Sequence, residues 1–261
     1  MAQPARREPD AGTAPAAGPL RLRLLGEFEL RSGSGTISVA RAQQRVLAYL
    51  AVIRRPVSRA LLSQQLADEP DEGRGPSALR SSLWRLPRPA GVSLVHSQGS
   101  DVRLAPEVSV DLWDSERSAQ HLHRPSALAG EHTPTDPADW SHDLLPEWSD
   151  DWLVMERESY RQLRLHALER LSETLREMGQ HASALMAALS AVRADPLRES
   201  AHRQVIAVHL AEGNAAEALR QYHAYRRLLA LELGLPPSPS IRGLVGPLLG
   251  RPIERPSRRR R

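Results

Sequence analysis

The chain has 261 residues, 41% of them hydrophobic, and a formal net charge of +4, which suits one large packed domain or two ordinary ones. Its 35 basic residues are all arginines and it has no cysteine, which excludes disulfides, thiolate metal sites, cysteine nucleophiles and lysine Schiff bases. No apolar run approaches the roughly 18 residues of a membrane span, and the absence of cysteine fits a cytoplasmic location.

The first part of the chain predicts a tail followed by strands. Residues 1–19 are rich in Ala, Pro and Gly without an apolar core, which is typical of a disordered tail. Apolar and charged residues alternate from Leu20 to Leu30, which predicts one or two strands with a kink near Gly26. A turn at 32–35 and a short strand over Thr36–Val39 follow.

Three helices and a hairpin come next. The apolar spacing predicts helices over Arg41–Ile53, Arg59–Ala67 and Ser77–Leu86, followed by a hairpin of Val92–His96 and Val102–Leu104. The loop 68–75 between the second and third helices is acidic. Strands, three helices and a hairpin make a winged helix-turn-helix, and we assign it residues 20–112.

The third helix has two unlike faces. Leu79, Leu83 and Leu86 form an apolar stripe, and the opposite face carries hydroxyl, guanidinium and indole groups, namely Ser77, Arg80, Ser81, Trp84 and Arg85. Arginine reads guanine edges and binds phosphates, and serine donates to either, so this face suits a recognition helix. The alternative is a surface helix with solvated arginines.

The second half, residues 113–250, is predicted to be all helical from Trp140 onward. Trp152–Met178 is one long amphipathic pattern that Gly179 ends. The motif that begins at Gly179 recurs at Gly213, an offset of 34 residues with paired alanines and a proline between the copies, as in tetratricopeptide repeats. A plain helical bundle is the alternative. Residues 251–261 form a basic tail.

Several motifs resemble one family. In the first half these are Leu25–Leu30, Gln43–Leu50, Leu79–Leu86 and Val110–Leu112; in the second half they are Leu163–Glu169, Asp195–His202, Gly213–Tyr222 and Glu232–Pro239. Together they resemble the small form of the antibiotic-regulatory-protein (SARP) type of bacterial transcriptional activator, over about residues 20–250. That family joins an OmpR-type winged helix-turn-helix to a tetratricopeptide-like bacterial transcriptional activator domain.

The resemblance implies a sequence-specific DNA-binding activator. Such a protein binds direct repeats in double-stranded DNA near promoters, as a homodimer, and contacts RNA polymerase. It is not an enzyme, and neither a cofactor nor a metal is expected. The DNA-binding candidates are Ser58, Arg59, Ser77, Arg80, Ser81, Trp84, Arg85, Arg88 and Arg103.

Some of these residues have other possible roles, and the chain departs from the family in places. Ser58 also suits a helix N-cap, Trp84 a packing residue, and Arg103 an exposed strand position. Many relatives have Leu-Trp where this chain has Leu66-Ala67, and the loop that follows is acidic. Because these acids leave the first domain with little net charge, the competing hypothesis is a tetratricopeptide scaffold that binds proteins, with weak or no DNA binding.

Overall fold

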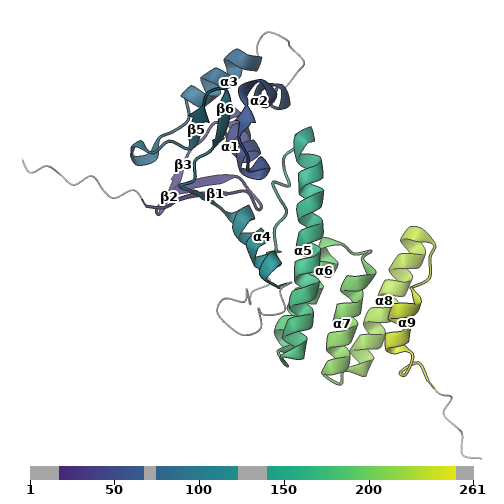
Figure 1. Cartoon of the computed structure of the whole chain (residues 1–261). Coiled ribbons are helices and arrows are strands. Elements are labelled where there is room, and N and C mark those ends of the chain that lie inside the picture. The colour runs from purple at the N-terminus through teal and green to yellow at the C-terminus, as the bar shows by residue number, and fades with distance from the viewer. Residues whose placement is uncertain (1–17, 68–74, 123–139, 251–261) are drawn as a thin grey trace, which may run out of the picture. The chain divides into compact units, whose positions relative to one another are not determined.

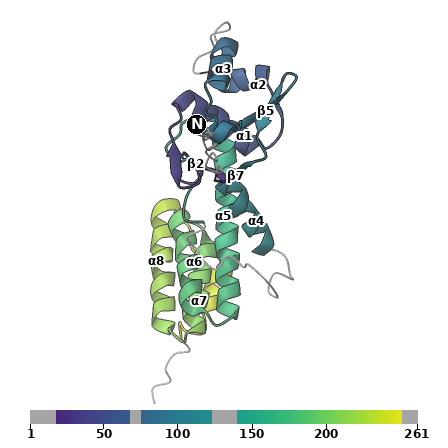
Figure 2. The same cartoon turned by 90° about the vertical axis from the view of Figure 1, so that its left-hand side faces the viewer.

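The structure is a computed structural model that describes residues 18–67, 75–122 and 140–250. The predicted tails, the acidic loop and the loop before Trp140 lie largely outside these described residues. The chain forms two compact units, residues 1–112 and 113–261, each of which has its own core. Figures 1 and 2 label most of the elements.

A four-stranded sheet opens the first unit. Its strand order is β3-β2-β1-β7, built from Gly35–Ile37, Glu29–Ser32, Leu20–Arg23 and Val108–Val110. The predicted alternation is confirmed in β1, where Leu20 and Leu22 are buried and Arg21 and Arg23 are exposed. The kink is also present, since Gly26 adopts a φ of 87° between β1 and β2. Strand β7, which pairs in parallel with β1, was not predicted.

The side chain of Asp111 fixes the kink after β1. Its carboxylate accepts hydrogen bonds from the backbone N–H groups of Leu24 and Leu25, at 2.8 and 3.0 Å. Burial raises the pKa of this carboxyl, although three backbone N–H groups lower it. The motif Val110–Leu112 therefore has a structural role, because the Asp111 side chain ties the end of β7 to the residues that follow β1.

The helix-turn-helix core consists of α1 (Arg41–Ile53), α2 (Arg59–Gln65) and α3 (Gly75–Trp84). Beside it lies a three-stranded sheet of order β4-β6-β5, formed by Val57–Ser58, Asp101–Leu104 and Val95–Gln98. The hairpin β5–β6, which turns at Gly99–Ser100, is the predicted wing, but its first strand begins three residues later than predicted. Strand β4 was not predicted, because two residues give no period.

Helix α3 starts and ends earlier than the predicted Ser77–Leu86. Proline is favoured in the first turn of a helix, so Pro76 extends the start to Gly75. At the other end the Leu86 N–H donates to the Leu83 carbonyl at 3.4 Å, a tighter turn that stops the helix before Pro87. The predicted apolar stripe is present: Leu79 and Leu86 are buried and Leu83 is half-buried.

The second unit begins with α4 (Asp111–Leu122), whose first two residues belong to the first unit. This helix was not predicted. Residues 141–150 contain no helix, contrary to the prediction that the chain is helical from Trp140 onward. They are an irregular segment anchored by buried Leu144, Leu145 and Trp148. The Arg157 guanidinium donates to all three of their carbonyls, which replaces the hydrogen bonds that a helix would provide.

Five helices complete this unit and stack side by side in Figures 1 and 2: α5 (Asp151–Glu177), α6 (His181–Ala194), α7 (Glu199–Ala211), α8 (Ala215–Leu233) and α9 (Pro239–Val245). The two repeat glycines end α5 and α7 in the same way. Gly179 and Gly213 have φ of 75° and 79°. In each case the N–H of the glycine and the N–H of the next residue cap carbonyls of the last helical turn.

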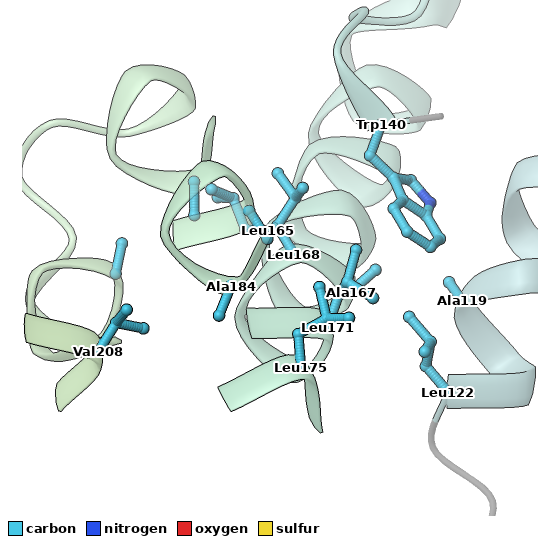
Figure 3. Close-up of a cluster of buried hydrophobic side chains, with 13 residues drawn as sticks. Ala119, Leu122, Trp140, Leu165, Ala167, Leu168, Leu171, Leu175, Ala184 and Val208 are labelled. Atoms are coloured by element: carbon cyan, nitrogen blue, oxygen red, sulfur yellow. The ribbon is translucent and has the colours of Figure 1, made fainter. Parts of the chain in front are cut away.

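One buried cluster of the second unit lies where α5, α6 and α7 meet (Figure 3), and another lies among α7, α8 and α9. Leucines of α5 face alanines of α6, for example Leu168 and Leu171 against Ala184 and Ala187, all fully buried. Small residues on one helix let the large ones on the next approach closely, which is the packing that the repeat motif predicts. Trp140 covers the α4 side of this core together with Leu122.

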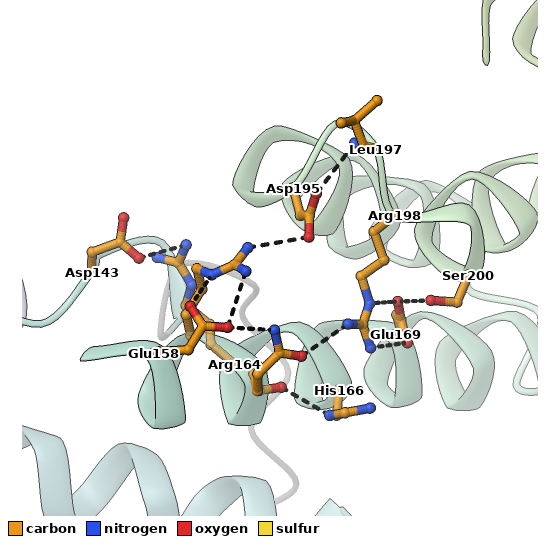
Figure 4. Close-up of polar contacts among 11 residues, drawn as sticks. Asp143, Glu158, Arg164, His166, Glu169, Asp195, Leu197, Arg198 and Ser200 are labelled. Carbon is orange, nitrogen blue, oxygen red and sulfur yellow. Dashed lines mark hydrogen bonds and ion pairs between the residues drawn. The ribbon is translucent and has the colours of Figure 1, made fainter. Parts of the chain in front are cut away.

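A polar network joins α5 to the segment between α6 and α7 (Figure 4). Arg198 donates to Glu169 at 2.6 Å, and Glu169 also accepts from the Ser200 hydroxyl at 2.6 Å. Arg161 bridges Glu158 and Asp195. These groups satisfy one another, so the network braces the helix stack and is not an open site.

Two further findings concern membrane-spanning helices and metal sites in the described part of the chain. No described helix is both long and apolar enough to cross a membrane. Within residues 18–67, 75–122 and 140–250, no group of three or more His, Asp or Glu side chains is placed to hold a metal ion.

Candidate nucleic-acid interface

The outer face of α3 presents the residues that the sequence singled out. Ser77, Arg80, Ser81, Trp84 and Arg85 are all exposed, and Trp84 is 80% exposed. A tryptophan this exposed does not pack in the domain, so the alternative role proposed for Trp84 is not supported by the structure. Among the described residues, neither Arg80 nor Arg85 makes a hydrogen bond or an ion pair, which leaves both guanidinium groups available for a ligand.

The N-terminus of α2 lies against the wing. The Ser58 hydroxyl accepts a hydrogen bond from the Leu61 N–H at 3.3 Å, so Ser58 is the N-cap of α2, as its sequence position indicated. The Arg59 N–H donates to the Ser100 carbonyl at 3.0 Å, and its guanidinium donates to the Ser97 hydroxyl at 3.0 Å. Arg59 therefore connects α2 to the wing hairpin.

The wing presents a second polar face. Register pairs His96 with Arg103 and Gln98 with Asp101, and strand alternation puts these four side chains on one face of the hairpin. They line a hollow of about 650 Å³ together with Pro56. The sequence identified only Arg103 here. His96 was missed because cross-strand neighbours become apparent only once the register is known.

A groove of about 640 Å³ lies between α2, α3 and β5. It brings together four of the nine predicted residues, Arg59, Arg80, Trp84 and Arg88. Ser58, Ser77, Ser81, Arg85 and Arg103 lie outside its lining. The predicted residues thus lie in the groove, on the outer face of α3, at the N-cap of α2 and on the wing, and Arg80 and Trp84 belong to both the groove and the α3 face.

The charged side chains among the described residues that line this groove are all arginines. No acidic side chain is among the described residues that line it, and Arg59, Arg80 and Arg88 are all exposed. Asp101, the acid of the wing, lines the other hollow, where its carboxylate accepts a hydrogen bond from the Ser100 hydroxyl. The arrangement can attract an anion to the groove and to the adjoining face of α3.

Comparison with known proteins identifies a family for more than half of the chain. The model of the bacterial transcriptional activator domain matches residues 111–249. Regulatory protein AfsR of Streptomyces coelicolor is 27% identical over 241 residues, which cover 87% of this chain and 24% of that protein. Regulatory protein AfsR of Streptomyces griseus is 26% identical over 255 residues, which cover 91% of this chain and 26% of that protein. This chain spans about a quarter of the length of these relatives.

A solved structure has the same fold. Mycobacterium tuberculosis EmbR, in a complex with a low-affinity phosphopeptide, matches with a TM-score of 0.71 and 20% identity, over 88% of this chain and 65% of that one. The fold class predicted from the sequence, a winged helix-turn-helix followed by a helical domain, is confirmed by this match.

Proposed function

Because the chain belongs to the SARP-type family of bacterial transcriptional regulators that carry a bacterial transcriptional activator domain, we propose that it is a sequence-specific DNA-binding activator of transcription. This family is a family of transcription regulators and is not an enzyme class. We further propose that the protein binds direct repeats in double-stranded DNA, forms a homodimer on that DNA and contacts RNA polymerase.

One observation carries the proposal: the outer face of α3 is exposed, and its two arginines, Arg80 and Arg85, make no hydrogen bond or ion pair with another described residue. Its inner face is fixed by Leu79 and Leu86, which are buried at 6% and 7% exposure. An anchored helix with free bidentate donors is what major-groove readout requires. Helix α3 contains no acid that could pair with these arginines at a spacing of three or four residues.

The proposed roles follow from position. Arg80, Ser81 and Arg85 read base edges in the major groove, and Trp84 lies against the groove wall. Ser77 and Arg88 flank them and bind phosphates. Arg103 on the wing reaches the minor groove or a phosphate. At the start of α2, the Arg59 guanidinium binds a phosphate, and Ser58 contributes as the N-cap that positions this end of the helix.

We assign dimerisation and polymerase contact to the helical unit. A stack of tetratricopeptide-like helices exposes broad surfaces for protein partners, and the family match covers this unit. Two copies side by side on a direct repeat would double the contacts with DNA, which raises affinity without new chemistry.

Selection of the purified chain against a random duplex library, at about 150 mM salt to weaken non-specific phosphate attraction, tests the proposal. We expect enrichment of a repeated motif. Folded protein that enriches no motif would contradict the proposal and favour the competing scaffold function.

A double variant then tests the α3 face. Arg80→Ala with Arg85→Ala should weaken binding to a single selected repeat by about 2–6 kcal/mol, since each base-reading pair is worth about 1–3 kcal/mol. The control is Arg226→Ala with Arg227→Ala, an equal loss of charge at exposed positions of α8. An equal loss of affinity in both double variants would show that only net charge matters.

A further inference from the structure

The groove between α2, α3 and β5 has the size of a small-molecule site. Its volume of about 640 Å³ lies within the range of roughly 300–1,000 Å³ typical of ligand pockets. Three different elements and the segment after α3 contribute to its lining. Each of them belongs to the same compact unit, so the groove is a feature of one domain.

The floor of the groove is apolar. The half-buried side chains of Leu83 and Val95 give it accessible apolar surface, and the buried Leu79, Leu86 and Leu94 complete the apolar part of the lining. Apart from its sugars and thymine methyl groups, a DNA duplex presents phosphates and polar base edges, which cover an apolar floor less completely than a ring system does. An apolar ring system would gain free energy by covering it.

Aromatic and cationic groups border this floor. Trp84 lines the groove yet is 80% exposed, so its ring is open to stacking. Arg88 and Arg80 line it without any hydrogen bond or ion pair to another described residue, and Arg59 adds a third guanidinium. Guanidinium groups bind carboxylates and sulfonates by charge-assisted hydrogen bonds.

We propose that this groove binds a small organic anion that combines an aromatic or fused-ring body with a carboxylate or sulfonate. The ring body lies on the leucine floor and against Trp84, and the acid group meets Arg80 and Arg88. Because the same side chains belong to the face assigned to DNA, the bound anion competes with duplex binding. That competition rests on the proposed function, whereas the anion site itself does not.

Titration with 8-anilinonaphthalene-1-sulfonate, an aromatic anion that fluoresces in apolar surroundings, tests the site on the full chain. We expect saturable binding of one probe per chain. The uncharged N-phenyl-1-naphthylamine should bind roughly tenfold or more weakly, as expected when a charge-assisted hydrogen bond is lost. Equal affinity for the two probes would overturn the assignment of the arginines.

Variants locate the probe. Arg88→Ala and Trp84→Ala should each weaken binding of the sulfonate probe by roughly tenfold. Ala60→Trp, at an exposed position of the lining, should exclude the probe by filling the groove. Arg226→Ala with Arg227→Ala is the control and should leave binding unchanged. Binding that survives all three groove variants would place the probe elsewhere and refute the proposal.

Titrations with duplex DNA distinguish the anion site from the proposed DNA-binding function, on which the competition between anion and duplex rests. We expect a selected duplex to displace the probe, and excess probe to release the duplex. A chain that binds its duplex but no probe retains the proposed function and refutes the anion site. Groove-dependent probe binding by a chain without DNA affinity supports the site and refutes the function.

Discussion

At the scale of single residues, His202 is a buried titratable group of the helical unit. It is 4% exposed, and its ring stacks on that of Tyr225 with centroids 4.2 Å apart. Its Nε2 lies 2.9 Å from the Pro196 carbonyl and its Nδ1 lies 2.8 Å from the Gln221 amide nitrogen. A neutral imidazole that donates from Nε2 and accepts at Nδ1 satisfies both contacts.

Burial lowers the pKa of His202, although Pro196, Asp195 and Glu199 act in the opposite direction. Below the ordinary histidine pKa of about 6.5, the unfolded chain therefore binds a proton that the folded chain resists. Stability should therefore fall as the pH decreases through and below about 6.5, the ordinary histidine pKa. Urea unfolding at several pH values checks this.

His202→Gln provides the comparison, since it cannot titrate. The variant should be less stable at neutral pH, but its stability should depend less on pH over this range than that of the parent chain. The other nine histidines are common to both proteins and cancel in the comparison. Equal pH dependence of the two proteins would show that His202 does not carry the effect.

At the scale of elements, the glycines that end α5 and α7 fix the helix stack. Gly213 has a φ of 79°, and a Cβ built there meets no atom within 4 Å. Space is therefore not the constraint. The constraint is the left-handed backbone conformation, which costs residues other than glycine about 1–2 kcal/mol.

Gly213→Ala should lower the free energy of unfolding by about 1–2 kcal/mol, because alanine is strained at this φ. Gly243→Ala in α9, where φ is not positive and the space is also open, should instead stabilise the unit by about 0.4–1 kcal/mol. Chemical unfolding of both variants measures the difference. The same sign of effect in both would contradict the conformational explanation.

The polar network that joins Glu169 of α5 to Arg198 and Ser200 leads to a further prediction at this scale. The side chains of Arg198 and Glu169 are 17% and 12% exposed, so neither is well solvated. Glu169→Ala should destabilise the unit by about 2–4 kcal/mol, because it leaves a largely buried guanidinium without its carboxylate. Ser200→Ala removes one hydrogen bond and no charge, and should cost about 1 kcal/mol. Calorimetry on both variants tests this ranking.

The local elements of the fold were predictable from sequence, and the non-local ones were not. Helices α1, α3 and α5 have long periodic patterns, and the repeat glycines specify their own turns. Strands β4 and β7 have two and three residues, too few to show a period, and form only because distant strands accept their hydrogen bonds. Helix α4 has a polar sequence and was missed.

The site shows the same division. The outer face of α3 follows from helical spacing, so Arg80 and Arg85 could be identified from the sequence. The contact of Arg59 with Ser97 joins residues 38 positions apart, and the groove arises from the convergence of α2, α3 and β5. Such convergence depends on tertiary packing, and no local pattern encodes it.

At the scale of the whole molecule, the net charge of +4 gives little general attraction to DNA. If Arg88 binds a phosphate, Arg88→Ala should reduce the slope of log K against log salt by about 0.9 and leave the selected sequence unchanged. Binding measured at several salt concentrations tests this. A changed sequence preference would mean that Arg88 reads a base.

The parallel pairing of β1 with β7 also governs the order in which the chain can fold. Leu20 pairs with Val108, so the first strand has no neighbour on that side until almost the entire N-terminal unit has been synthesised. Until then β1 can pair only with β2, and its other edge stays open to strands of other chains. Closing a loop of this length is slow compared with forming helices. During translation, completion of this sheet is therefore the late step, and it leaves the nascent unit exposed to aggregation.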